Sequence, residues 1–196
     1  MHQIDCDYVI GCDGFHGISR QTIPDAVCSE FEKVYPFGWL FVLSQTPPIS
    51  HELIYSNHEQ GFALCSMRKE NLSRHYIQTL LIDQVDDWSD ARFWDELKKQ
   101  ILETAADTLI TRDPLEKSIA LLDSFICELM RWRRLFLVYD AAHIVPPTGP
   151  KGLNLAVSDI HYLSELFIVF YAREDHEGLE RYSKIALARV WKGSQF

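Results

Sequence analysis

The segment Asp7-Tyr-Val-Ile-Gly-Cys-Asp-Gly-Phe-His-Gly-Ile-Ser-Arg20 decides the fold class of the chain. Its short apolar run ends in three glycines within seven positions and leads into a polar stretch, which predicts a strand, a tight loop and the start of a helix. Glycines let backbone approach a ligand closely, and Asp13, His16 and Arg20 could contact hydroxyl and phosphate groups. A plain turn with a solvated arginine is the alternative.

A second segment, Tyr139-Asp-Ala-Ala-His-Ile-Val-Pro-Pro-Thr-Gly-Pro-Lys-Gly-Leu-Asn154, follows the apolar run 135–138, which predicts a buried strand. Its prolines and glycines predict a turn-rich loop, with a helix beginning near Leu153. A helix N-terminus presents free N–H groups and partial positive charge, so an anionic or reducible ring would be stabilised in front of it. A proline-rich connection without a ligand is the alternative.

Between these segments the chain is rich in aromatic residues and punctuated by turn residues, which predicts an antiparallel sheet. Its strand-like runs are Phe37–Leu43, His51–Tyr55, Phe62–Cys65 and Arg74–Gln78. Apolar residues recur at helical spacing from Ser89, a plausible N-cap, to Leu109, and a final helix is predicted from about Leu179 to Trp191. The order of elements predicts an α/β layer with an inserted α+β sheet domain.

Composition narrows the classes of function. The 196 residues carry 19 Lys and Arg against 28 Asp and Glu, a formal net charge of −9, which argues against a nucleic-acid partner. No apolar run approaches the roughly 18 residues that cross a bilayer, and Asp5 and Asp7 stand where a signal peptide needs a basic start, so a cytoplasmic protein without membrane contact is expected. The five scattered cysteines predict free, mostly buried thiols and no metal site.

Together and in this order, the two segments resemble the flavin-dependent aromatic hydroxylases, which carry an Asp-Gly motif and, about 120 to 130 residues later, a Gly-Asp-Ala-Ala-His motif. Further runs resemble the branch of this family that hydroxylates 4-hydroxybenzoate. They include Tyr35-Pro-Phe-Gly-Trp39, His51-Glu-Leu-Ile-Tyr55, Gly61-Phe-Ala-Leu-Cys-Ser66, Asp87-Trp-Ser-Asp90, Leu115-Glu-Lys-Ser-Ile-Ala120 and His143-Ile-Val-Pro-Pro-Thr-Gly149. The resemblance implies conversion of 4-hydroxybenzoate, or a similar aromatic carboxylate, to 3,4-dihydroxybenzoate with FAD, NADPH and O2, and it allows a homodimer.

The resemblance assigns substrate contacts to residues on the predicted sheet. Arg68, with Ser66 and Tyr76, supplies the guanidinium fork and hydroxyl groups that a carboxylate needs. Tyr55 matches the phenol that hydrogen-bonds the substrate's 4-hydroxyl and draws off its proton, and Pro147 would offer its carbonyl to the same end of the substrate. Without the resemblance, these residues would be an ordinary polar rim of a sheet.

Cofactor contacts follow from the same resemblance. Arg74 matches a residue near the flavin ring, where a fixed positive charge favours the reduced, anionic flavin. Asp140 would lie at the ribityl chain, and the backbone of residues 152–154 at the pyrimidine edge of the flavin. The full set implied is Asp13, Arg74, Asp140, Gly152, Leu153 and Asn154 for FAD, with His16 and Arg20 for NADPH.

Two departures from the family pattern stand out. The Gly-x-Gly-x-x-Gly loop that cradles the ADP part of FAD is missing, since the spacing of Gly11, Gly14 and Gly17 does not match it. Tyr139 occupies the position of the family's glycine, where a side chain could clash with the flavin chain. The chain is therefore expected to be an internal piece of a family protein that is inactive by itself.

The expected organisation is a partial FAD-binding layer that carries an antiparallel-sheet substrate-binding domain. Its parts are residues 1–28 with the Asp-Gly motif, 29–125 as the substrate-binding sheet domain, 126–175 as the return to the FAD-binding domain, and 176–196 as the start of a C-terminal helical region. The competing hypothesis is a non-catalytic remnant that binds an aromatic carboxylate or a partner chain.

Overall fold

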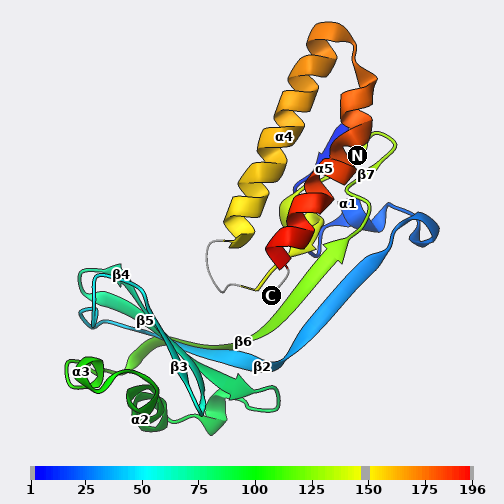
Figure 1. The fold of residues 1–196 in the computed structure, drawn as a ribbon. Coiled ribbons are helices and arrows are strands. Elements are labelled where there is room, and N and C mark those ends of the chain that lie inside the picture. Colours follow the sequence, from blue (N-terminus) through cyan, green and yellow to red (C-terminus); the bar gives the residue numbers. More distant parts are fainter. Residues whose placement is uncertain (1–2, 147–150, 195–196) are drawn as a thin grey trace. The chain divides into compact units, whose positions relative to one another are not determined.

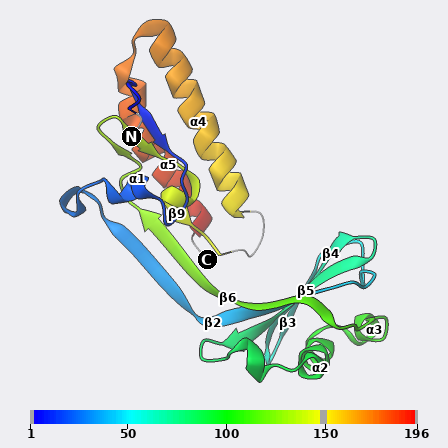
Figure 2. The ribbon, with the colours of Figure 1, turned by 180° about the vertical axis from the view of Figure 1, so that it is seen from behind.

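The computed structural model describes residues 3–146 and 151–194. The chain forms two compact units: unit 1 comprises Met1–Val34 and Asp123–Phe196, and unit 2 comprises Tyr35–Leu122. Two long strands, β2 (Glu30–Ser44) and β6 (Pro114–Cys127), contribute residues to both units (Figures 1 and 2). The predicted α/β class with an antiparallel sheet is confirmed.

Unit 2 is built on antiparallel strands whose burial follows the pleat. β3 (Ile54–His58), β4 (Gly61–Lys69) and β5 (Leu72–Leu80) lie beside β2, and with β6 and the two-residue strand β9 (His143–Ile144) they form a sheet of order β3-β4-β5-β2-β6-β9. In β5 every second side chain from Ser73 to Thr79 is buried, because successive side chains of a strand point to opposite faces. The predicted strand at His51–Tyr55 is wrong in its first half, since the backbone bends at His51 and Glu52 and β3 begins at Ile54.

An amphipathic helix covers the buried face of this sheet. Ser89 accepts a hydrogen bond from the Arg92 backbone N–H (3.2 Å), so the predicted N-cap of α2 (Asp90–Gln100) is confirmed. The helix does not continue to Leu109, because Ile101 takes an extended conformation and buries its side chain. After Ile101 the chain forms the short helix α3 (Glu103–Ala106). The 3-10 turn η2 (Val85–Asp87) precedes α2. The core residues of unit 2 include Leu40, Val42, Ala63, Ile77, Phe93, Trp94 and Leu97.

Unit 1 joins both termini of the chain. β1 (Val9–Gly11) pairs in parallel with β8 (Leu135–Leu137), which pairs with β7 (Arg131–Trp132), so the predicted strands at both motifs are confirmed. The short helix α1 (Ile18–Gln21), the 3-10 turns η1 (Asp25–Val27) and η3 (Tyr139–Ala141), and β9 (His143–Ile144) complete the layer. Two helices, α4 (Lys151–Arg173) and α5 (His176–Ser194), pack on each other, and α5 contains the predicted final helix.

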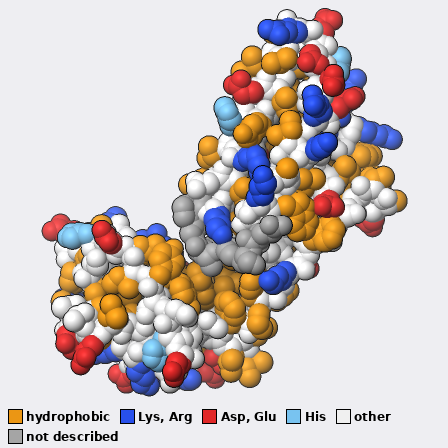
Figure 3. Space-filling view, viewed as in Figure 1, with side chains coloured by type: hydrophobic (Ala, Val, Ile, Leu, Met, Phe, Trp, Pro, Cys, Tyr) orange, Lys and Arg blue, Asp and Glu red, His pale blue; other side chains and the backbone are white. Residues whose placement is uncertain are grey.

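Helix α4 is long and apolar enough, by length and composition alone, to cross a membrane. The expectation that no segment is apolar enough to cross a bilayer is therefore wrong for α4, although one such helix is weak evidence for a membrane span; 22% of its apolar window is buried in the structure. The buried carboxylate of Asp159 on α4 accepts hydrogen bonds from His143 Nε2 (2.6 Å) and the Tyr139 N–H (3.2 Å), which fixes one side of the helix to its own unit. Figure 3 shows charged side chains among the hydrophobic ones over the helices of unit 1.

A buried histidine lies in the core of unit 2. His75 is 1% exposed, and its ring meets the edge of Trp94 at a centroid distance of 5.4 Å. Neither ring nitrogen has a hydrogen-bond partner among the described residues. Burial disfavours the charged imidazolium and lowers the pKa of His75 to about 4.

We therefore expect acid to destabilise the chain through His75. In the unfolded chain His75 binds a proton below a pKa of about 6.5, whereas in the native state it does so only near pH 4. Between these two pH values the unfolded state binds more protons, so the free energy of unfolding falls as the pH drops from about 6.5 to about 4. The total fall is at most about 3 kcal/mol. His75→Phe keeps a ring against Trp94 and removes the titration. Denaturant unfolding at several pH values should give a flatter profile for His75→Phe than for the exposed control His51→Gln, and equal slopes would refute the assignment.

Candidate functional site

The predicted substrate residues share one face of the unit 2 sheet. Strand register places Tyr55 opposite Leu64, Leu64 opposite Tyr76, and Tyr76 opposite Phe41, so these four side chains form one row across four strands. Two residues further along β4 and on the same face, Ser66 lies opposite Arg74. The aromatic rings of this face touch, with Trp39 stacked on Phe62 at 5.4 Å and packed edge-on to Tyr76 at 5.5 Å. The row and its neighbours form an aromatic surface with polar groups at its edge.

Arg68 supplies an available cation at the edge of this surface. Arg68 lies at a register shift in β4 between Met67 and Lys69, on the same face as Ser66 and Leu64, and its Nη2 lies 3.4 Å from the Tyr76 hydroxyl. The guanidinium is exposed and forms no ion pair with any residue that the structure describes. Ser66 makes a long hydrogen bond of 3.5 Å to the Met67 carbonyl. Aromatic rings beside an unpaired guanidinium can bind an aromatic carboxylate.

Arg74 differs from Arg68 because its charge is already paired. Its Nη2 lies 3.2 Å from Glu116 Oε2, and its guanidinium lies 4.5 Å from the centre of the Phe41 ring. The sequence did not single out Glu116, which lies on β6 in a stretch whose charged, exposed first half hides its strand pattern. The ion pair lowers the net positive charge that Arg74 presents to this face.

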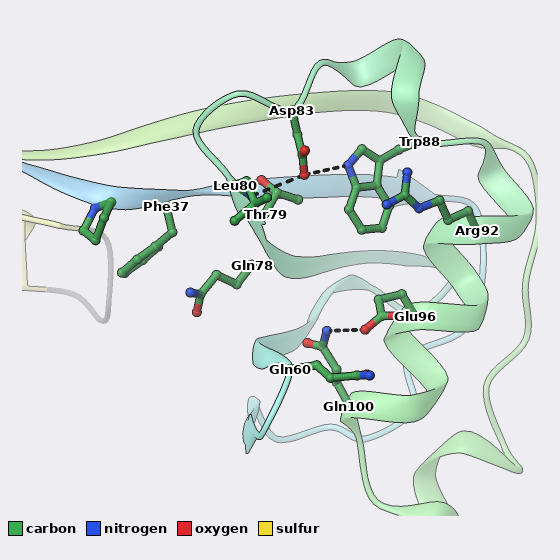
Figure 4. A pocket seen from close by; sticks show the side chains of 11 residues that line it. Phe37, Gln60, Gln78, Thr79, Leu80, Asp83, Trp88, Arg92, Glu96 and Gln100 are labelled. Atoms are coloured by element: carbon green, nitrogen blue, oxygen red, sulfur yellow. Dashed lines mark hydrogen bonds between the residues drawn. The ribbon is translucent and has the colours of Figure 1, made fainter.

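A cavity of about 390 Å³ opens elsewhere in unit 2 (Figure 4). Phe37 and Gln78 lie on one side of it and the α2 residues Arg92 and Glu96 on the other. The Arg92 guanidinium is stacked 3.9 Å from the Trp88 ring and donates to the Asp87 carbonyl (2.7 Å). The cavity contains none of the predicted substrate residues and does not form part of the candidate site.

The two sequence motifs lie side by side in unit 1. Arg20 of the first motif donates hydrogen bonds to the Ala141 carbonyl (3.2 Å) of the second and to the Phe15 carbonyl (2.9 Å). Its guanidinium also lies 4.4 Å from the Phe125 ring centre and forms an ion pair with Glu30. The predicted NADPH residues therefore differ in availability, because Arg20 is held by its own unit whereas His16 is exposed.

The glycines of the first motif make room for the motif's own loop. A Cβ on Gly17 would lie 2.2 Å from Asp13 Cγ, and one on Gly11 would lie 2.5 Å from the Ser19 Cβ. Asp13 accepts a hydrogen bond from the Ser19 N–H (2.8 Å), which caps α1 and holds the pKa of the Asp13 carboxyl below its usual value. The glycine spacing thus has a packing explanation that the sequence alone did not supply.

The second motif surrounds a buried acid that sequence reasoning missed. Asp159, on α4, is hydrogen-bonded to His143 and to the backbone of Tyr139, as described above. The sequence signal that could have revealed its burial is the four-residue spacing that places Asp159 on the same face of α4 as the buried Leu155 and Leu163. Asp140 is partly buried, which raises the pKa of its carboxyl, while the nearby His143 lowers it.

The remaining predicted cofactor residues lie at the start of α4. Gly152, Leu153 and Asn154 are in its first turn, where the backbone N–H groups of a helix lack intrahelical acceptors and can donate to an anionic ligand. Leu153 and Asn154 are exposed. Pro147 lies outside the described residues.

Tyr139 has the backbone conformation of a glycine, with φ at 58°. A left-handed conformation costs a residue with a Cβ roughly 1 kcal/mol. We expect Tyr139→Gly to raise the free energy of unfolding by up to about 1 kcal/mol, as measured by denaturant unfolding. Tyr139→Ala is the matched control, since it removes the same ring but keeps the Cβ. Equal stability of the two variants would mean that the backbone at this position is not strained.

Comparisons with known proteins agree on one fold. A family model described as an FAD binding domain matches residues 1–196. The p-hydroxybenzoate hydroxylase of Acinetobacter baylyi is 54% identical over 195 residues, which are 100% of this chain and 48% of that protein. The chain thus spans about half the length of this curated relative.

Solved structures share the fold at low sequence identity. The probable FAD-dependent monooxygenase pqsL of Pseudomonas aeruginosa superposes with a TM-score of 0.74 at 16% identity, covering 96% of this chain and 52% of that one. Aklavinone-11 hydroxylase in complex with FAD and aklavinone gives a TM-score of 0.70 at 18% identity, covering 93% and 36%.

Proposed function

This chain belongs to the FAD binding domain family, and from that premise we propose that it supplies the substrate-binding sheet and part of the flavin site of a 4-hydroxybenzoate 3-monooxygenase. The reaction would convert 4-hydroxybenzoate to 3,4-dihydroxybenzoate with NADPH and O2. Support comes from the 54% identity to a p-hydroxybenzoate hydroxylase over the whole of this chain.

The observation that carries the proposal is the aromatic surface of unit 2 with Arg68 at its edge. An aromatic carboxylate fits this surface, because its ring can pack on the aromatic side chains while its carboxylate pairs with the guanidinium. Tyr76 and Ser66 would add hydroxyl donors beside Arg68. Tyr55 stands on the edge strand of the same row, with its hydroxyl unpartnered among the described residues, so it can receive a hydrogen bond from a substrate phenol.

The residues present in unit 1 fit the flavin part of FAD. The exposed first turn of α4 offers backbone donors to an electron-rich ring edge, and the Asp140 carboxylate has no hydrogen-bond donor among the described side chains, so it can accept from a ribityl hydroxyl. FAD, when bound, supplies the activation of O2 and the transfer of an oxygen atom. Asp13 would support this site indirectly, since its carboxylate is engaged in capping α1.

The chain's own residues then have distinct tasks. Arg68 binds and orients the carboxylate, and the aromatic row excludes water from the substrate ring. The Tyr55 hydroxyl would accept a hydrogen bond from the 4-hydroxyl and pass its own proton on to solvent, to which it is exposed. The substrate then becomes a phenolate, with higher electron density at the carbon to be hydroxylated. Arg74 would add positive charge near the flavin, moderated by Glu116. We propose NADPH as the reductant, with His16 as the more accessible of its two predicted contacts, and a cytoplasmic location.

The test is a chimera in which this chain replaces the matching 195 residues of the Acinetobacter baylyi hydroxylase. We expect the chimera to bind FAD, to oxidise NADPH when 4-hydroxybenzoate is added, and to form 3,4-dihydroxybenzoate, followed by absorbance and chromatography. Substrate binding without any product would instead favour the non-catalytic remnant. Folding and FAD binding without affinity for 4-hydroxybenzoate would refute the proposed substrate.

A further inference from the structure

Two cysteines that are 99 positions apart in the sequence meet in unit 1. The Sγ atoms of Cys28 and Cys127 lie 2.8 Å apart. Beside them the Glu128 N–H donates to the Ser29 carbonyl (2.7 Å), which joins the backbone before β2 to the backbone after β6. Cys127 is fully buried and Cys28 is half-buried, so the pair is reached from the side of Cys28.

A carboxylate completes a cluster of three donors. Ligand atoms of Cys28, Glu30 and Cys127 all lie within 4.8 Å of one another. A surface cavity of about 410 Å³, lined by Arg20, Gln21, Ile23, Asp25, Cys28 and Glu30, leads to this cluster. A hydrated ion therefore has a route to the donors and room for a water molecule as a further ligand.

The charges around the cluster balance for a divalent cation. Two thiolates and one carboxylate carry three negative charges, and a divalent ion with the Arg20 guanidinium carries three positive ones. Arg20 lies 3.1 Å from Glu30, with a side chain that is 12% exposed. Arg20 also donates to the Phe15 and Ala141 carbonyls, so it stays fixed if Glu30 turns toward an ion. It would act as a neighbour that orients and neutralises a ligand of the metal.

We propose that Cys28, Glu30 and Cys127 bind a thiophilic divalent cation, with Zn²⁺ as the expected ion. Thiolate sulfur and carboxylate oxygen are common zinc ligands, and a site with three protein ligands keeps a fourth position for water. With Zn–S distances of about 2.3 Å in tetrahedral geometry, the sulfurs separate to about 3.8 Å, which the half-buried Cys28 side chain can provide by rotation. Each thiol releases its proton to solvent on binding.

Formation of a disulfide is the competing fate of such a pair. A disulfide forms only when an oxidant removes two electrons from the pair, whereas a cation binds the reduced thiols without any oxidant. A cation can displace the thiol protons because it stabilises the thiolates directly. The bound ion would link the start of β2 to the end of β6.

The experiment is a titration of the reduced full-length chain with Cd²⁺, a spectroscopic stand-in for Zn²⁺, followed by its ultraviolet thiolate charge-transfer band. The exposed thiols are removed first by Cys6→Ser and Cys12→Ser. We expect one equivalent of Cd²⁺ to bind, with release of about two protons to a pH indicator, and Zn²⁺ to compete. Cys28→Ser should lose most of the band, whereas Cys65→Ser, which changes the buried cysteine of unit 2, should keep it.

Glu30→Gln tests the carboxylate ligand; it also removes the ion pair to Arg20, which keeps its hydrogen bonds to the Phe15 and Ala141 carbonyls. It should weaken Cd²⁺ binding at least about tenfold relative to Glu32→Gln, an exposed acid on the same strand. Equal affinities of these two variants, or a full band in Cys28→Ser, would overturn the proposal. A Cys28–Cys127 disulfide that forms in air and persists in the presence of Cd²⁺ would identify a redox pair instead.

Discussion

In the chimera described above, Tyr55→Phe is expected to leave 4-hydroxybenzoate binding intact and to lower the rate of its hydroxylation by about 10²- to 10⁴-fold. The Tyr55 ring packs against Phe62 at a centroid distance of 5.7 Å, a contact that phenylalanine preserves. The substitution removes only the hydroxyl, which has no partner among the described residues. Loss of activity without loss of affinity would therefore report proton transfer rather than positioning.

The measurement separates three quantities: substrate affinity by fluorescence titration, NADPH oxidation by absorbance, and product by chromatography. In Tyr55→Phe, oxidation of NADPH should continue with release of hydrogen peroxide in place of product. Tyr171→Phe, a change at an exposed tyrosine of α4, should behave like the unmodified chimera. A normal product yield in Tyr55→Phe would eliminate Tyr55 as the activating phenol.

Arg68→Ala is expected to weaken 4-hydroxybenzoate binding by about 2 to 5 kcal/mol, which is at least roughly 30-fold in Kd. The guanidinium is exposed and unpaired in the chain as described, so the ligand's carboxylate would be left without its cation once the flavin and substrate exclude water from the site. Arg68→Lys keeps the positive charge but loses the guanidinium fork, so its affinity for 4-hydroxybenzoate should lie between those of the unmodified chimera and Arg68→Ala.

Fluorescence titration of the chimera with 4-hydroxybenzoate measures this effect, since Trp39 is part of the aromatic surface. Arg92→Ala is the matched control, because Arg92 belongs to the same unit but is stacked on Trp88 in a separate cavity. Equal affinities of Arg68→Ala and Arg92→Ala would show that no carboxylate clamp exists at Arg68.

Local patterns in the sequence determined much of the architecture. The strand-like run Arg74–Gln78 identified the middle of β5, the glycines after the first apolar run identified the turn into α1, and Ser89 identified a helix start. Each of these signals depends on residues that are close together in the chain, so it can be recognised from the sequence alone. The substrate face followed in part, because strand alternation can place several polar residues on one side.

Tertiary contacts determined which residues that are far apart in the sequence become partners, and local sequence patterns do not predict these pairs. The Arg68 guanidinium meets the Tyr76 hydroxyl across neighbouring strands, and Glu116 pairs with Arg74 from a strand whose exposed, charged first half concealed it. Folding likewise buries Asp159 against the second motif and brings Cys28 and Cys127 together across 99 positions. Periodicity reports the face on which a residue lies, whereas the partner across that face depends on strand order and register. Both are set by packing of the whole unit.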